Sequence, residues 1–209
     1  MLVGVLTLAV SGCSSSAPST TPSPPVATSL SGSATDAVAD TVLLPVLRNG
    51  VSVTPVVAIL PDLVAVTIDV SAGNLTGTIS LAPGTFSHTD TFVCLLLDVD
   101  ENPSTGGPPA AGDVALGYDY SICAVNPRRS ATAQVSRLGG GVATGIGSVP
   151  ATFVSADAVR FTVPLSLLGG DEGRMAFKVT SNQWVDDPVF NTAVIDWMPD
   201  VGRAAGLTR

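Results

Sequence analysis

Three oxygen-bearing side chains stand at alternate positions directly after an apolar run. Asp98, Asp100 and Asn102 follow the segment Phe92 to Leu97. Because alternate residues of an extended chain share one face, their oxygens can converge on one point. Carboxylate and amide oxygens are the ligands that Ca²⁺ takes in proteins. The spacing therefore predicts a calcium-binding loop after this run.

The same loop also has a purely structural interpretation. Asp and Asn side chains accept hydrogen bonds from nearby backbone N–H groups and so cap turns. An EF-hand is excluded, because Pro103 and Pro109 stand where that loop needs Gly and a bidentate Glu. An irregular calcium loop and a loop held by turn capping both remain open.

Two cysteines indicate which residues lie opposite this loop. If the segment 91–99 pairs antiparallel with 114–125 so that Cys94 faces Cys123, the same register sets Asp119 opposite Asp98. Opposed carboxylates repel each other unless a cation or a proton lies between them. We expect Asp119 to be a further calcium ligand. We also expect a Cys94–Cys123 disulfide, with two buried thiols as the alternative.

Other chemistry finds little support. His88 is the only histidine and lies in a polar segment without a serine-nucleophile motif, and a zinc site needs several nitrogen or sulfur ligands. The net charge of −8 argues against nucleic-acid binding, because no basic patch is available to neutralise phosphates. We therefore expect a protein that is not an enzyme.

The N-terminal segment indicates a membrane anchor. An apolar stretch from Leu2 to Val10 is followed by Ser11-Gly12-Cys13 and a tract rich in Ser and Pro. This order resembles the lipobox of bacterial lipoproteins, in which the cysteine is lipidated. The resemblance implies a signal peptide over 1–12, a lipid on Cys13 as the membrane partner, and a location in the cell envelope on the extracytoplasmic side. The tract is too poor in apolar residues to fold, which predicts a disordered tether over 13–35.

The rest of the chain, 36–209, has the pattern of a β-rich domain. Of the acidic residues only Glu101 and Glu172 are Glu, and the whole sequence has 21 Gly and 16 Pro, which favours turns over helices. Apolar and polar residues alternate along many short segments, as in half-buried antiparallel strands. These segments are near 41–47, 51–59, 63–70, 74–81, 91–99, 114–125, 131–138, 151–155, 158–163, 174–180 and 190–197. The pattern predicts an all-β, antiparallel two-sheet β-sandwich of jelly-roll or immunoglobulin-like type, with about ten strands.

The loop and its neighbours also carry a family resemblance. The run Asp98-x-Asp-x-Asn-Pro-x-Thr-Gly106, the later Gly117-Tyr-Asp-Tyr120 and the closing Asp196-Trp-Met-Pro-Asp200 resemble family-9 carbohydrate-binding modules and DOMON-like domains. The resemblance covers about 60–200 and implies a secreted β-sandwich that binds a ligand or serves a structural role.

Aromatic residues would clamp the sugar if this chain binds carbohydrate, as they do in the carbohydrate-binding relatives. Trp184, in a polar segment, and Tyr118 are the candidates, and packing at a loop base is the alternative for Trp184. The leading expectation is a lipid-anchored binding or structural module with Ca²⁺ in the Asp98–Asn102 loop and a cell-envelope partner. The alternative is a carbohydrate-binding module that uses Trp184.

Overall fold

The computed structural model describes residues 29–43, 46–48, 51–53, 60–86, 91–107, 115–125, 132–170, 174–183, 194–200 and 202–207. The predicted signal peptide with Cys13, and also His88 and Trp184, lie outside these residues. Nowhere in the described ranges is there a helix with the length and apolar character that crossing a membrane requires.

The described residues form strands and a single short 3₁₀ helix. The elements are β1 (Leu30–Thr35), β2 (Val42–Leu43), β3 (Val46–Arg48), β4 (Val51–Val53), β5 (Leu63–Ser71), β6 (Asn74–Leu81), β7 (Thr91–Asp98), β8 (Tyr120–Val125), β9 (Thr132–Gly139), β10 (Val142–Ser155), β11 (Ala158–Pro164), η1 (Leu165–Leu168), β12 (Ala176–Gln183), β13 (Val194–Met198) and β14 (Ala205–Gly206). The all-β, antiparallel prediction is confirmed.

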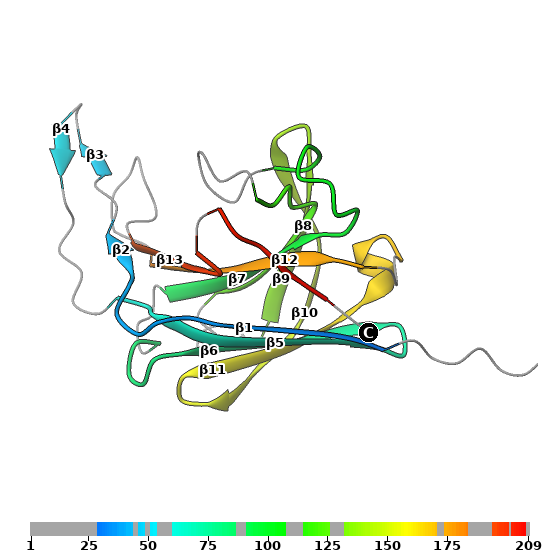
Figure 1. Ribbon diagram of the computed structural model, residues 1–209, viewed down its shortest axis with the longest axis horizontal. Coiled ribbons are helices and arrows are strands. Elements are labelled where there is room, and N and C mark those ends of the chain that lie inside the picture. Colours follow the sequence, from blue (N-terminus) through cyan, green and yellow to red (C-terminus); the bar gives the residue numbers. More distant parts are fainter. Residues whose placement is uncertain are drawn as a thin grey trace, which may run out of the picture.

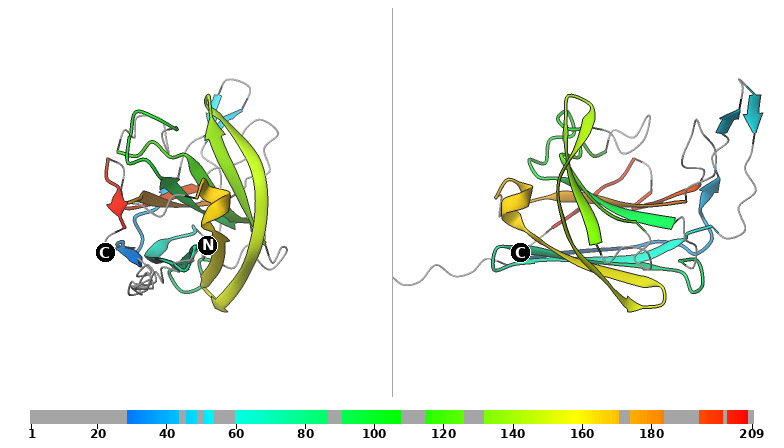
Figure 2. Two further views of the ribbon diagram at one scale, coloured as in Figure 1. Left: turned by 90° about the vertical axis from the view of Figure 1, so that its right-hand side faces the viewer. Right: turned by 180° about the vertical axis from the view of Figure 1, so that it is seen from behind.

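Most strands belong to one continuous sheet that curls into a nearly closed, barrel-like form. Its order is β1-β5-β6-β11-β10-β9-β8-β7-β12-β13-β2, while β3 and β4 pair separately. In Figure 1, β1, β5, β6 and β11 form the lower layer, and β7, β12 and β13 lie above them. The long strand β10 joins the two layers, because its residues up to Pro150 pair with β9 and those from Ala151 pair with β11 (Figure 2). The predicted pair of separate sheets is thus replaced by two layers of one sheet.

The core lies between the two layers and follows the predicted alternation. In β6 every second side chain from Leu75 to Leu81 is buried, and in β11 Val159, Phe161 and Val163 are buried in the same way. The strand β7 is buried on both faces, as its apolar run predicts. Val93, Leu95 and Leu97 enter the main core, whereas Cys94 and Leu96 pack with Leu116 on the other face.

Two segments form strands where the sequence predicted none. Residues 30–35, expected to belong to the disordered tether, form β1 and pair along β5 from Leu30↔Val70 to Thr35↔Ala65. Residues 142–150, which no predicted strand covers, form the first part of β10. Both segments are rich in small residues and lack a strong alternating pattern. Their strand conformation therefore depends on pairing with a neighbouring strand rather than on their own sequence.

The gap between β1 and β12 is closed by the short strand β14. It pairs with the start of β12 and lies beside β1, where a Cβ on Gly32 would come within 2.7 Å of Leu207 Cδ2 and 2.9 Å of the Gly206 carbonyl oxygen. Only glycine at position 32 lets the two backbones approach so closely. The C-terminal segment therefore seals one side of the curled sheet.

Candidate metal centre

The pairing of β7 with β8 sets the geometry of the predicted site. Cys94 lies directly opposite Cys123, with a Cα–Cα distance of 4.1 Å, and the two are joined by a disulfide. The paired register ends at Leu97↔Tyr120, and the Asp119 N–H donates to the Leu97 carbonyl oxygen at 2.8 Å, so Asp119 does not take the next regular place in the ladder, opposite Asp98. The predicted disulfide is confirmed, and a carboxylate oxygen of Asp119 still lies close to one of Asp98.

Glycines let the loop after β7 fold back onto the segment before β8. A Cβ on Gly106, whose φ is +63°, would lie 2.3 Å from the Tyr118 carbonyl oxygen, and one on Gly117 would lie 2.2 Å from that of Thr105. Gly107 and Tyr118 exchange two backbone hydrogen bonds, of 3.1 and 2.9 Å. These contacts bring the loop against the chain that carries Asp119.

Three of the four predicted ligands meet in the structure. Asp98, Asp100 and Asp119 each contribute a carboxylate oxygen to a group whose members all lie within 4.8 Å of one another. Asp98 is only 1 % exposed, Asp119 is half-buried and Asp100 is exposed. We call these three side chains the loop carboxylates. They present hard oxygen donors at a position that solvent can reach, as a bound Ca²⁺ requires.

Asn102 plays a different part from the one expected of a ligand. Its side-chain oxygen accepts the Ser104 N–H at 3.1 Å, whereas its backbone N–H donates to Asp98 Oδ1 at 3.1 Å and to Asp100 Oδ1 at 2.9 Å. The Thr105 hydroxyl donates to Asp100 Oδ2 at 2.9 Å, and the Val99 N–H donates to Asp119 Oδ2 at 3.1 Å. The loop carboxylates thus accept hydrogen bonds that cap the turn, and they also lie close to one another. The first observation favours turn capping, and the second favours a calcium-binding loop.

The pKa values of the loop carboxylates are shifted by burial, by hydrogen bonds and by the closeness of the three groups. Burial raises the pKa of Asp98, and the neighbouring carboxyl of Asp100 adds to the rise. Burial likewise raises the pKa of Asp119. Desolvation acts on Asp100 too, but hydrogen bonds from Thr105 and from the Asn102 backbone outweigh it and lower the pKa of that group. A cation between them would relieve the repulsion that remains once all three are ionised.

The aromatic candidates do not form a sugar platform in the described part of the chain. Tyr118 is half-buried and packs against the cluster of Cys94, Leu96 and Leu116, and burial raises the pKa of its phenol. Trp184 lies outside the described residues. Trp197 is half-buried, with its ring centroid 5.8 Å from the Lys178 ammonium nitrogen.

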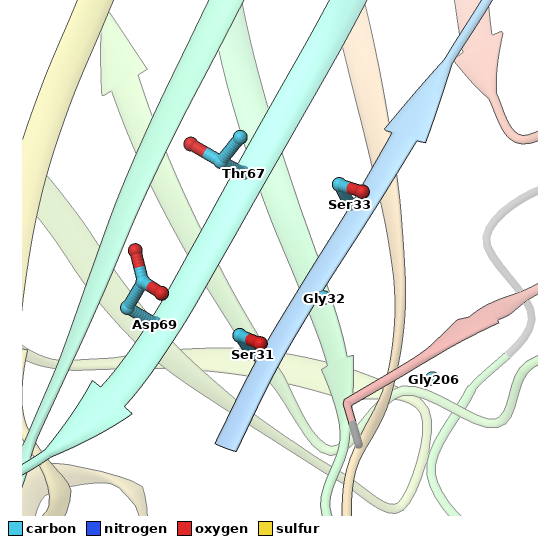
Figure 3. Close-up of a pocket in the computed structure, with 6 residues that line it drawn as sticks. All are labelled: Ser31, Gly32, Ser33, Thr67, Asp69 and Gly206. Atoms are coloured by element: carbon cyan, nitrogen blue, oxygen red, sulfur yellow. The ribbon is translucent and has the colours of Figure 1, made fainter. Parts of the chain in front are cut away.

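An open groove of about 530 Å³ lies on the outer face of β1 and β5 (Figure 3). It is lined by Ser31, Gly32, Ser33, Thr67, Asp69 and Gly206. No aromatic side chain is among these residues. Gln183, the last described residue before Trp184, lies about 20 Å along β12 from Phe177, which packs beneath Gly32. The groove is therefore polar and separate from that end of β12.

Sequence reasoning missed a second group of carboxylates. Asp62 and Asp196, which the sequence did not indicate as ligands, are both buried and lie together with Asp40. Their positions along the chain hold no local signal of this contact. A buried Asp at the start of one strand and another inside a distant strand become neighbours only when the sheet closes.

Comparisons with known proteins add no relative. The chain matches no protein-family model, no curated protein and no solved structure.

Proposed function

We propose that this chain is a non-enzymatic, calcium-stabilised β-sandwich module that a lipid on Cys13 holds on the extracytoplasmic side of a bacterial membrane. The observation that carries the calcium assignment is the grouping of Asp98, Asp100 and Asp119, with carboxylate oxygens within 4.8 Å of one another. Three convergent carboxylates and no nitrogen or sulfur donor in the group favour a hard cation that takes oxygen ligands.

The sandwich assignment is supported by two layers of antiparallel strands over one apolar core. Jelly-roll and immunoglobulin-like domains share that arrangement. The resemblance of the 98–106 run to family-9 carbohydrate-binding modules and DOMON-like domains points the same way. A disulfide suits an oxidising compartment outside the cytoplasm, which is where the lipobox-like N-terminus would place the domain.

The calcium ion would act on the loop rather than on a substrate. Bound between the end of β7 and Asp119, it would hold the loop in the folded-back position that Gly106 and Gly117 permit. A module built this way presents a rigid loop at one end of the sheet to a partner in the cell envelope. Carbohydrate binding through Trp184 is the alternative and stays a prediction.

The test compares calcium binding by the full chain and by Asp100→Asn. This substitution removes one charge but keeps an acceptor for Thr105 and Asn102, so a loop held only by turn capping should be unaffected. We expect Asp100→Asn to lose one bound Ca²⁺ in calorimetric titration, and with it the stabilisation of about 2.7 kcal/mol that a ligand provides at a hundred times its dissociation constant. Mg²⁺ should substitute poorly because it resists dehydration.

Asp69→Asn is the matched control, because Asp69 is exposed, pairs with Ser31 across β1 and β5, and does not belong to the loop carboxylates. It should titrate like the unaltered chain. Identical calcium stoichiometry and melting temperature in Asp100→Asn would leave turn capping as the explanation of the loop.

A further inference from the structure

Five aspartates meet where the two ends of the sheet approach each other. Asp36 and Asp40 lie in the segment after β1, Asp62 precedes β5, Asp196 is in β13 and Asp200 follows it. We call them the seam carboxylates. Three segments distant in sequence supply them, and the side chain of Asp196 already ties two of these segments together, because its Oδ2 accepts the Leu63 N–H at 2.5 Å.

The seam carboxylates form two overlapping groups. Carboxylate oxygens of Asp40, Asp62 and Asp196 lie within 4.8 Å of one another, and so do those of Asp36, Asp40 and Asp200. Asp40 belongs to both groups and is exposed, so it lies at the solvent side of the cluster. The buried members are Asp62 and Asp196, at 4 % and 3 % exposure.

Asp62 holds a buried oxygen without a hydrogen-bond partner. Its Oδ2 accepts the Ala39 N–H at 2.9 Å, but its Oδ1 is buried and accepts no hydrogen bond from any of the described residues. The Oδ2 of Asp36 is in the same condition. By contrast, both oxygens of Asp196 are used, by the N–H groups of Leu63 and Trp197. A buried carboxylate oxygen is strongly unfavourable unless a donor or a cation satisfies it, so the free oxygen of Asp62 marks a position for a positive charge.

The surroundings leave the cluster rich in negative charge. Lys178 is fully buried, and its ammonium donates to the Asp200 backbone carbonyl at 3.0 Å, so one cation stands at its edge. Burial raises the pKa of Asp196 to about 6, with a further rise from the charges of Asp40 and Asp36. The pKa of Asp36 is also raised to about 6, first by burial. In both groups burial is the main cause of the rise, and the nearby carboxylates add to it.

We propose that the seam carboxylates bind a divalent cation, Ca²⁺, centred on Asp40, Asp62 and Asp196. All donors are carboxylate oxygens, which excludes the nitrogen- or sulfur-rich coordination that zinc prefers. Asp36 and Asp200 belong to the second group that shares Asp40, and they can provide further ligands to the ion. The ion clamps the segment after β1, the start of β5 and β13, so it holds the two ends of the curled sheet together. This site is independent of the loop carboxylates and of the proposed function.

The test is a calcium titration of the full chain with three isosteric variants. Asp40→Asn removes the shared ligand at an exposed position, so folding without metal should be unchanged, while calcium affinity at the seam falls at least tenfold. Asp62→Asn removes the buried, unsatisfied charge and should abolish the same binding event. Asp69→Asn, exposed and outside both carboxylate groups, is the control and should bind like the unaltered chain.

The two calcium proposals fail separately in this design. If both hold, the chain binds two Ca²⁺, Asp62→Asn loses one, Asp40→Asn binds that one at least tenfold more weakly, and Asp100→Asn loses the other. A single calcium that survives Asp100→Asn but is weakened by Asp40→Asn and lost in Asp62→Asn supports the seam alone. Unchanged stoichiometry and affinity in both Asp40→Asn and Asp62→Asn, with melting temperatures that respond to Ca²⁺ as in the control, would overturn the seam site.

Discussion

Cys94 and Cys123 occupy directly opposed positions in β7 and β8, and their disulfide closes the hairpin that carries the loop carboxylates. The two cysteines are 29 residues apart in sequence. A covalent link of that span restricts the unfolded chain, while it leaves the native pairing unchanged. The bond therefore stabilises the part of the sheet from which the loop departs.

We expect the double variant Cys94→Ala/Cys123→Ala to lose about 3–4 kcal/mol of unfolding free energy, the value that the chain-entropy model assigns to a loop of this length. Urea denaturation of the variant beside the unreduced protein measures the difference. The unaltered protein treated with a thiol reductant is the control and should shift in the same direction. A loss below about 1 kcal/mol would mean that the unfolded chain is not restricted by this link.

Asn102 was predicted to be a calcium ligand through its side chain, but in the structure it acts on the loop carboxylates through its backbone. Its side-chain oxygen faces Ser104, while its backbone N–H draws Asp98 and Asp100 together. The residue thus positions two of the loop carboxylates through its main chain. Glu101 before it has a φ of +52°, in the left-handed region, so the backbone turns sharply between the two acidic residues and Asn102.

At the scale of elements, the loop after β7 is held by close contact between two backbone segments. Gly117 lies under the Thr105 carbonyl oxygen, where no Cβ fits. Position 139, in the β9–β10 hairpin, differs in that a Cβ there would have no atom within 4 Å. The two glycines therefore form a matched pair for testing the contact.

Gly117→Ala should destabilise the protein by about 1–3 kcal/mol, the range seen when a tightly packed position is overfilled. It should also weaken calcium binding at the loop, because Asp100 can no longer reach Asp119. Thermal melts with and without Ca²⁺ measure both effects. Gly139→Ala should stay within about 0.5 kcal/mol of the unaltered chain. Equal behaviour of the two variants would show that the folded-back loop is not needed for stability.

At the scale of the whole molecule, the curled sheet places its first strand next to its last. β1 follows directly on the segment that would lead from the membrane, and β14 packs beside it at Gly32. A domain attached through Cys13 would therefore be held at the edge strand β1. Both proposed cations lie elsewhere on the sheet, one at the loop after β7 and the other where β5 approaches β13.

Lipidation is tested with Cys13→Ser in a bacterial host, using a complete lipoprotein signal ahead of the chain. The unaltered protein should incorporate labelled fatty acid and partition into detergent, because several acyl chains on one cysteine anchor stably. Cys13→Ser should lose both properties, and Ser16→Ala should keep them as the control. A Cys13→Ser protein that stays equally bound to membranes would remove the lipid anchor from the proposed function.

The sequence alone determined the features that depend on contacts between neighbours in the chain. Alternation in segments such as 74–81 and 158–163 predicted strands, because a strand that packs on one face must alternate. The pairing of Cys94 with Cys123 predicted the register of β7 and β8 as far as Leu97↔Tyr120, since a single register determines every pair along a regular ladder.

Only the tertiary structure decided the features that join distant segments. β1 and the first part of β10 have few side chains that favour a strand. They are strands because their backbones pair with β5 and β9. β10 joins the two layers because it pairs with β9 on one side and with β11 on the other. The seam carboxylates come together across 133 residues between Leu63 and Asp196, a contact made when the sheet curls closed. Side-chain periodicity reports which face of a strand is buried, but it contains no information about which remote residue will cover that face.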